Sequence, residues 1–242
     1  MKMKKLPTKS IVLILAAIFL LGSGCSVQKL AVRSMSGLLE DSMTALFEET
    51  DLELAEHAIA SDLKLLEGIL KSDPENEKYL FMASQGFAAY ALGFVEDENP
   101  QRAKQLYLRG RDYGLKILRK NKPFRQAEDQ ELEIFTQSLK KLDKKDVPAL
   151  FWTANNWGNF INLSMNDPIA LADLPRVQAM MERVIELDDS YFFGGAHLFL
   201  GTLLAVRPPI LGGDMKKAKA HFDRCFELSQ GKFLEICKSR QK

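Results

Sequence analysis

The sequence predicts an all-α fold, and three of its features lead to that prediction. Apolar residues recur at intervals of three and four along most of the 242 residues. No segment of useful length alternates apolar and polar side chains, as a half-buried strand would. Turns that contain proline, glycine or asparagine separate the apolar segments and can stop helices. The composition, 46% hydrophobic and 27% charged, suits one large globular domain or two small ones.

The N-terminus has the layout of a secretory signal. Four lysines precede the apolar run 11–21, and small residues follow it up to Cys25. Gly24-Cys25 resembles a bacterial lipobox, although Leu21 lies one place earlier than that motif requires. We therefore expect a signal peptide (1–24), a lipidated Cys25 with a tether (25–36), and a helical domain (37–242). An ordinary signal peptide and an uncleaved anchor with an incidental cysteine are the alternatives.

Charge and lipidation together predict where the mature chain acts. Cleavage before Cys25 removes four lysines and no acid, so the formal charge changes from +1 to −3. A mildly acidic domain offers no electrostatic footprint for nucleic acid. The acyl chains of a lipoprotein would anchor it stably to a membrane. Ser26 resembles the residue that favours outer-membrane sorting, so we expect the periplasmic side of a bacterial membrane, with the outer membrane favoured.

The segments before residue 146 predict five helices. Asp51 can cap the second helix, Pro74 follows its end, and Pro100 fits the start of the fourth. The expected helices cover residues 35–47, 52–70, 79–95, 101–120 and 126–142.

Four more helices are expected after residue 146. Asp146 can cap the first, and Asp214, after Gly212 and Gly213, can cap the last. Gly194 and Gly195 would allow close backbone approach where the third helix begins. The expected helices cover residues 147–165, 177–185, 196–206 and 215–229.

One spacing recurs three times and favours a repeat architecture. Three sets of four residues share successive separations of 4, 3 and 5 positions, and the fourth residue of each set falls at an expected turn. The sets are Asp62-Leu66-Ile69-Pro74, Val177-Met181-Val184-Asp189 and Ala218-Phe222-Cys225-Gln230. This pattern matches the second helix of a tetratricopeptide unit, in divergent form. We therefore expect tetratricopeptide-like antiparallel helix pairs that form a compact α-solenoid with a surface suited to binding.

Motifs for catalysis, metals or cofactors do not occur in the sequence, so we expect neither an enzyme nor a cofactor. His57, His197 and His221 lack compact metal-ligand spacing. His57 and His221 are expected on helix surfaces, and His197 is expected as a hydrogen-bonded, buried imidazole. Two free thiols are favoured over a disulfide for Cys225 and Cys237.

The candidate ligand or channel face lies on the helix expected over 147–165. Spacings of 3, 4, 3 and 4 place an aromatic ring and four amides on one side, namely Trp152, Asn155, Asn159, Asn162 and Asn166. Asparagine is unfavourable inside helices because its side chain competes for the backbone. The face could line a cleft or a water-filled channel, contact a neighbouring helix or subunit, or meet solvent.

The region from Asp146 onward resembles the T component (TatT) associated with TRAP transporters. The resemblance is carried by residues 146–149, 170–176 and 194–197, by Pro208-Pro209 with 211–214, and by Ala218, His221 and Phe222. It implies a periplasmic lipoprotein, a homotrimer with a central pore, and a partnership with the transporter's periplasmic substrate-binding protein. It also implies a role in channelling an apolar or organic-acid ligand.

The C-terminus and the repeat pattern each allow an alternative. Members of that family continue with helices beyond the region of Leu228, whereas this chain ends at Lys242, so a truncated helical domain is one interpretation. A general tetratricopeptide-like adaptor for envelope protein assembly is the alternative function.

Overall fold

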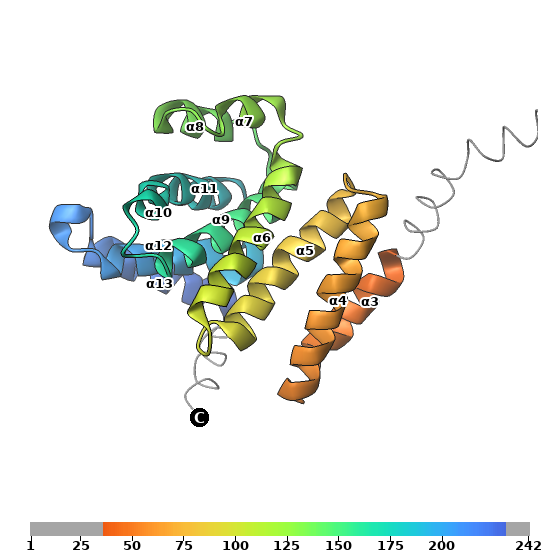
Figure 1. Ribbon diagram of the computed structural model, residues 1–242. Coiled ribbons are helices and arrows are strands. Elements are labelled where there is room, and N and C mark those ends of the chain that lie inside the picture. The colour runs from red at the N-terminus through yellow and green to blue at the C-terminus, as the bar shows by residue number, and fades with distance from the viewer. Residues whose placement is uncertain (1–35, 231–242) are drawn as a thin grey trace, which may run out of the picture. The chain divides into compact units, whose positions relative to one another are not determined.

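Helices make up all the regular secondary structure of residues 36–230, the range that the computed structural model describes (Figure 1). Because no strand occurs in this range, the all-α prediction is confirmed. No helix within it is long and apolar enough to cross a bilayer. The predicted signal peptide and Cys25 lie outside the described residues. The chain divides into two compact units, of which the first ends at Tyr79 and the second begins at Leu80.

The first unit contains α3 (Ser36–Phe47) and α4 (Leu52–Ser72). As predicted, Asp51 caps α4, because its Oδ1 accepts hydrogen bonds from the backbone nitrogens of Glu53 and Leu54 at 3.1 Å. The two helices contact each other, and the hydroxyl of Ser42 lies 3.4 Å from the carboxylate of Asp62. The buried residues of α4 recur every three or four positions and are Ala55, Ile59, Leu63, Leu66, Ile69 and Leu70.

The boundary between the units falls in the first turn of α5, and the second unit holds the rest of α5 and the helices that follow it, which Figure 1 labels. In chain order they are α5 (Glu77–Tyr90), the π-helix η1 (Ala91–Val95), α6 (Pro100–Leu118), α7 (Lys122–Ala127), α8 (Leu132–Leu139), the 3₁₀-helix η2 (Lys144–Asp146), α9 (Val147–Asn162), α10 (Pro168–Ala172), α11 (Leu174–Asp188), α12 (Tyr191–Val206), the 3₁₀-helix η3 (Pro209–Leu211) and α13 (Met215–Ser229).

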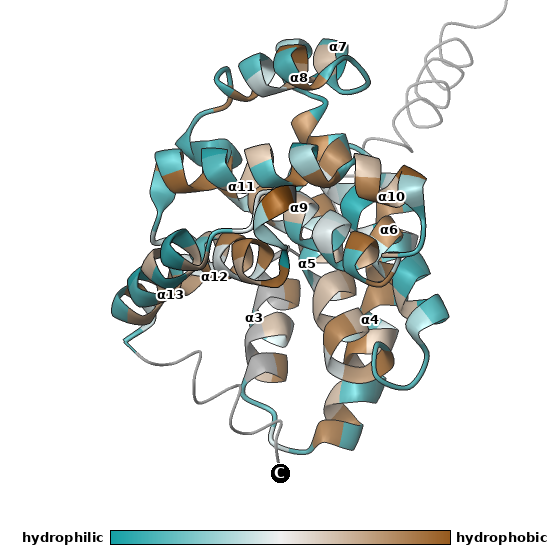
Figure 2. Cartoon of the chain, turned by 90° about the vertical axis from the view of Figure 1, so that its left-hand side faces the viewer, coloured by the Kyte–Doolittle hydropathy of each residue, from teal (hydrophilic) through white to brown (hydrophobic). Residues whose placement is uncertain are grey.

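Helix α9 is the centre of the second unit. It packs against α6 and α11, while α12 packs against α11 and α13. One continuous core joins α6, α9, α11 and α12, and it includes Leu115 on α6 and Leu203 on α12. Figure 2 shows the corresponding pattern: α12 is mostly brown or white, whereas α13 carries much teal. Successive helices therefore bury their apolar faces on one another, as in a helical repeat array.

Glycines allow the helices around α9 to approach it closely. A Cβ atom added at Gly114 of α6 would lie 2.1 Å from Thr153 Oγ1 of α9. One added at Gly110 would lie 2.4 Å from the amide oxygen of Asn156, and one at Gly158 of α9 would lie 2.3 Å from the ring of Phe199. At such distances a side chain at any of these positions would force the facing group to shift, so glycine lets the helices pack this closely without rearrangement.

The three repeat spacings coincide with helix ends. Helix α4 ends two residues before Pro74, and α11 and α13 end one residue before Asp189 and Gln230. The apolar positions of the α11 copy, Val177, Met181 and Val184, are fully buried, whereas Phe222 of the α13 copy remains 36% exposed. The spacing therefore predicts both the turn and, in α11, the packing face.

The helix predicted over 126–142 is wrong in its extent, because the structure has two helices there, α7 and α8. Arg176 of α11 donates hydrogen bonds to the backbone carbonyls of Glu128, at 2.9 Å, and Gln130. Arg119, directly after α6, pairs with the Glu128 carboxylate at 2.6 Å. These contacts hold residues 128–131 outside either helix.

The helix predicted over 147–165 is also too long, because α9 ends at Asn162. Asp146 does not cap α9. Its Oδ2 instead accepts a hydrogen bond from the backbone nitrogen of Asp143 at 2.9 Å, within the capping box of η2.

Helix α12 begins with a left-handed turn. Phe192, Phe193 and Gly194 have φ values of 46°, 58° and 75°. Left-handed geometry costs a non-glycine residue about 1–2 kcal/mol. Gly194 and Gly195 are buried, and a Cβ atom on either would meet Leu228 or Phe151 at about 3 Å. The close approach predicted for these glycines is therefore confirmed.

The substitution Gly114→Ala is expected to lower the free energy of unfolding by about 1–3 kcal/mol, because its methyl group would overlap Thr153 and force α6 away from α9. Gly93→Ala is the matched control, since nothing lies within 4 Å of the added Cβ atom there. Urea unfolding followed by circular dichroism would measure both. Equal losses in the two variants would contradict the close-packing account.

Candidate functional site

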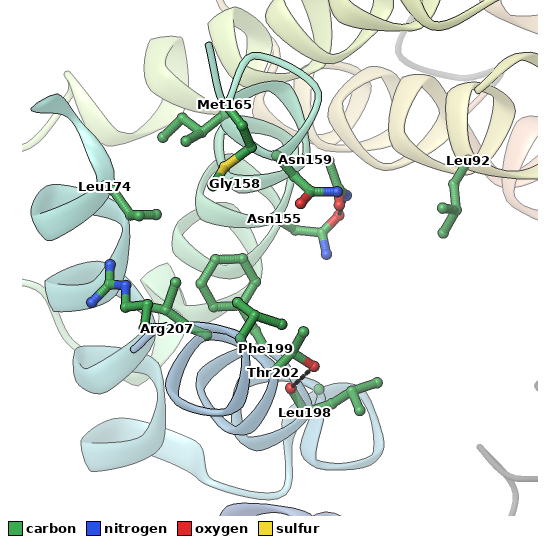
Figure 3. A pocket seen from close by; sticks show the side chains of 15 residues that line it. Leu92, Asn155, Gly158, Asn159, Met165, Leu174, Leu198, Phe199, Thr202 and Arg207 are labelled. Atoms are coloured by element: carbon green, nitrogen blue, oxygen red, sulfur yellow. Dashed lines mark hydrogen bonds between the residues drawn. The ribbon is translucent and has the colours of Figure 1, made fainter. Parts of the chain in front are cut away.

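A cavity of about 340 Å³ opens in the second unit, mainly between α9 and α12 (Figure 3). Residues of η1, of the turn after α9 and of α11 complete its wall. Its volume lies at the lower end of the range for small-molecule sites. Most of the wall is apolar, and the apolar side chains are Leu92, Ile161, Met165, Leu174, Leu198, Phe199, Leu203 and Val206.

Three of the predicted site residues line this cavity together, namely Asn155, Asn159 and Asn162. Asn159 Nδ2 donates a hydrogen bond to Asn155 Oδ1 at 3.3 Å. Asn155 and Asn159 are half-buried and Asn162 is exposed. An amide carries two donors and an acceptor with two lone pairs, so this one bond leaves hydrogen-bonding capacity toward the cavity.

The other two predicted residues, Trp152 and Asn166, do not line the cavity. Trp152 is only 6% exposed, and its ring packs against Phe151 and Phe192 with centroids 5.2 and 4.8 Å apart. Asn166 is exposed in the turn beyond α9. The helical stripe fails at Asn166 because the helix has already ended at Asn162.

The wall of the cavity opposite α9 was not predicted from the sequence. It consists of Leu198, Phe199 and Thr202 on α12, with Arg207 directly after that helix. Thr202 Oγ1 donates to the carbonyl of Leu198 at 2.9 Å. A threonine inside an otherwise apolar helix and an arginine at its end were the available signals. Neither signal shows that α12 faces α9, because that is a tertiary contact.

Arg207 is held by its surroundings at one end of the cavity. Its Nη1 lies 3.3 Å from the side-chain oxygen of Gln178 on α11. Its backbone carbonyl touches Gly213, where an added Cβ atom would lie 1.8 Å away. The loop is also tied back by a 3.1 Å hydrogen bond from the Asp214 nitrogen to the carbonyl of Leu204. Partial burial lowers the pKa of Arg207.

Asp214 caps α13 as predicted. Its Oδ1 accepts hydrogen bonds from the backbone nitrogens of Lys216 and Lys217 at 3.0 Å. These bonds hold the pKa of Asp214 below its ordinary value. The carboxylate is therefore engaged by its own helix.

Two imidazoles pair between α12 and α13, away from the cavity wall. The Nδ1 atoms of His197 and His221 are 2.8 Å apart, so one ring donates and the other accepts. His197 Nε2 lies 4.0 Å from Asp189, whose carboxylate is bound by Arg224 at 2.7 Å. The expectation that His221 would lie on a helix surface is wrong, because it is half-buried against His197.

Cys225 is a buried free thiol whose Sγ lies 3.8 Å from the carbonyl oxygen of Phe193. Burial raises the pKa of the thiol, which makes it a poor nucleophile. Cys25 and Cys237 lie outside the described residues. Across residues 36–230, no cluster of three or more histidine, cysteine, aspartate or glutamate side chains could hold a metal ion.

Comparison with known proteins agrees with the resemblance in the sequence. A model of the family described as TRAP transporter T-component matches residues 48–238. The chain belongs to this family. The match includes the cavity, the loop at Arg207 and the histidine pair, and it gives the chain an accessory role in a TRAP transporter.

An individual relative agrees over much of the length. An uncharacterized protein of Treponema pallidum (strain Nichols) is 27% identical over 237 residues, in a match that covers 84% of this chain and 72% of the relative.

Stability is expected to decrease as the pH falls from 8 to 5, because of the histidine pair. Burial lowers the pKa of both imidazoles below their ordinary value of 6.5. The unfolded chain therefore takes up protons near pH 6.5, before the folded protein does, and acid favours unfolding. Thermal unfolding of wild type and His221→Asn, which does not titrate, would test this. The variant should show the smaller drop in melting temperature, and equal drops would contradict the assignment to this pair.

Proposed function

We propose that the chain is a periplasmic, lipid-anchored accessory protein that docks the substrate-binding protein of a TRAP transporter and holds an apolar organic ligand between α9 and α12. The observation that carries the ligand part is the cavity, whose wall is mostly apolar but includes three amides. Family membership supports the transporter part.

The composition of the cavity suits transient holding of a small apolar molecule. Burial of apolar surface supplies affinity at about 25 cal/mol per Å². A few convergent polar groups then fix the orientation of the ligand. Asn155 and Asn159 are such groups, because their amides have spare capacity beyond the bond that joins them. In our proposal the ligand passes between this cavity and the binding protein.

We further propose that the protein assembles as a homotrimer on the periplasmic side of the outer membrane. The lipobox-like Gly24-Cys25 and the following Ser26 support the location, and the family resemblance supports the trimer. Lipidation would keep the cavity near the transporter's binding protein, because two or more acyl chains hold a protein stably at a membrane.

Filling the cavity should abolish ligand binding without abolishing docking. Thr202→Trp places a bulky ring in the cavity, whereas Thr50→Trp is the matched control on an exposed residue before α4. We expect wild type and the control to bind the neutral fluorescent probe N-phenyl-1-naphthylamine, and Thr202→Trp to lose at least tenfold in affinity, roughly what burying a medium-sized apolar group contributes.

The same proteins would be mixed with the substrate-binding protein of a TRAP transporter, and complexes would be measured by calorimetry. All three should bind it. A wild-type protein that binds extended peptides but neither the probe nor the binding protein would overturn the proposal in favour of an envelope adaptor.

Replacement of Cys25 by serine is expected to abolish lipid attachment, because the acceptor thiol is removed. Labelling with an alkyne fatty acid and membrane fractionation would measure the change. Cys225→Ser is the control, since that thiol is buried in the helical domain. Unchanged labelling of Cys25→Ser would show that Cys25 is not the lipidated residue.

A further inference from the structure

The turn between α12 and α13 exposes apolar side chains to water. Ile210, in η3, is 91% exposed, which makes it the most exposed of the large apolar side chains that the structure describes. Val206, before the turn, and Met215, after it, are 68% and 69% exposed. Figure 1 shows this segment as a blue loop that projects from the end of α12. Single exposed apolar side chains are ordinary on a protein surface, but three within ten residues of one projecting loop indicate a contact surface.

Backbone hydrogen bonds hold this loop in one conformation. The nitrogen of Gly212 donates to the carbonyl of Pro209 at 3.1 Å. At the base of the loop, the nitrogen of Asp214 donates to the carbonyl of Leu204, also at 3.1 Å. Gly212 has a left-handed φ of 87°, which glycine adopts without strain. The loop therefore presents Ile210 in a fixed position, and little conformational entropy is lost when that side chain is buried elsewhere.

Basic side chains follow the apolar turn. Residues 206–219 include four basic residues and one acidic residue, Asp214, so the formal net charge of this segment is +3. The basic residues are Arg207, Lys216, Lys217 and Lys219. Lys216 is exposed, and the side chains of Lys217 and Lys219 are 74% and 76% exposed. Because the mature chain predicted from the sequence has a formal charge of −3, positive charge is concentrated at this loop.

The lysines occupy the end of α13 where a helix disfavours cations. Lys216 and Lys217 directly follow Met215, the first residue of α13, and the first turn of that helix contains no acidic residue. The positive end of the helix dipole lies at this end, so exposed lysines here reduce the stability of the helix. Folding stability therefore does not account for them, and such a departure from local preference is typical of a functional surface.

An aliphatic tip beside exposed lysines suits a lipid surface better than a protein partner. Protein interfaces are depleted in lysine, and their strongest contacts come from tryptophan, tyrosine and arginine. A bilayer with anionic lipid instead offers acyl chains to short apolar side chains and phosphates to ammonium groups. The long stem of a lysine lets its charge stay at the headgroups while an apolar neighbour goes deeper.

We propose that the loop 206–215 contacts a membrane, with Ile210 and Met215 inserted into the surface of a bilayer that contains anionic phospholipid, and with the lysines at the start of α13 bound to its phosphates. This inference goes beyond the proposed function, because it depends neither on the ligand of the cavity nor on the docked binding protein. Val206 and Arg207 also line the cavity, so the contact places one end of the cavity at the membrane surface.

The test measures whether the loop enters lipid. The full-length chain with Ile210→Trp is incorporated into vesicles of phosphatidylethanolamine and phosphatidylglycerol with brominated acyl chains, because bromine quenches tryptophan fluorescence on contact. Ile134→Trp, at an isoleucine of α8 that is 50% exposed, is the matched control. Trp152 and Trp157 are buried, and their signal is subtracted with the wild-type protein. Bromine should quench the added tryptophan in Ile210→Trp and leave Ile134→Trp unchanged.

Charge reversal connects the insertion to the lysines. In the Ile210→Trp protein, Lys216→Glu with Lys217→Glu should lower the ratio of inserted to free loop by about fivefold or more for each lysine, which is the effect of one basic residue near an anionic surface. Glutamate is favourable at the start of a helix, so the fold should be retained. Lys140→Glu with Lys141→Glu, at exposed neighbours at the end of α8, is the matched control and should leave the quenching unchanged.

Three results would overturn the membrane contact. They are equal quenching of Ile210→Trp and Ile134→Trp, quenching that is as strong in vesicles of brominated phosphatidylcholine alone, and quenching that survives the reversal of both lysines. If bromine leaves Ile210→Trp unquenched, while the substrate-binding protein of a TRAP transporter shields it from acrylamide in water, the loop is a protein-docking site instead. Binding of N-phenyl-1-naphthylamine tests the proposed ligand site separately from all of these results.

Discussion

The second unit depends on close contact between α9 and the helices on either side of it. Helix α9 is buried over most of its surface, so α6 and α12 must both approach it within side-chain contact. Gly110 and Gly114 permit that approach on the side of α6, and Gly158 permits it on the side of α12. Close packing leaves few voids in an ordinary core. Against this background the cavity is distinctive, because it occurs where the tightly packed face of α9 gives way to a row of amides.

This arrangement connects the packing of the unit with its role in transport. The same helix supplies the central core and, through Asn155 and Asn159, the polar side of the cavity. Helix α12 supplies the apolar side and ends at Arg207. A site built on two packed helices holds its shape without a ligand, which suits the transient ligand binding that we propose for it. Membership in the TRAP transporter T-component family gives the chain an accessory role in such a transporter.

The sequence predicts this structure best where one residue determines local geometry. Asp51 and Asp214 cap the helices that they were expected to cap, and Gly194 and Gly195 are buried in close contacts. It predicts less well where distant side chains decide, as when Arg176 separates α7 from α8 by binding backbone carbonyls. The candidate site follows the same division. Helical spacing placed three asparagines together, but it could not show that Trp152 turns into an aromatic cluster or that Arg207 joins the cavity from another helix.

The contact between Gly213 and the carbonyl of Arg207 can form only after the residues that line the cavity have been synthesised. The end of α12 receives its support from residues that follow it in the chain, through this contact and through the bond from Asp214 to Leu204. A ribosome synthesises the lining of the cavity first and this support afterwards. A nascent chain that stops at Arg207 therefore has the residues that line the cavity but lacks the later contacts that hold Arg207 in place.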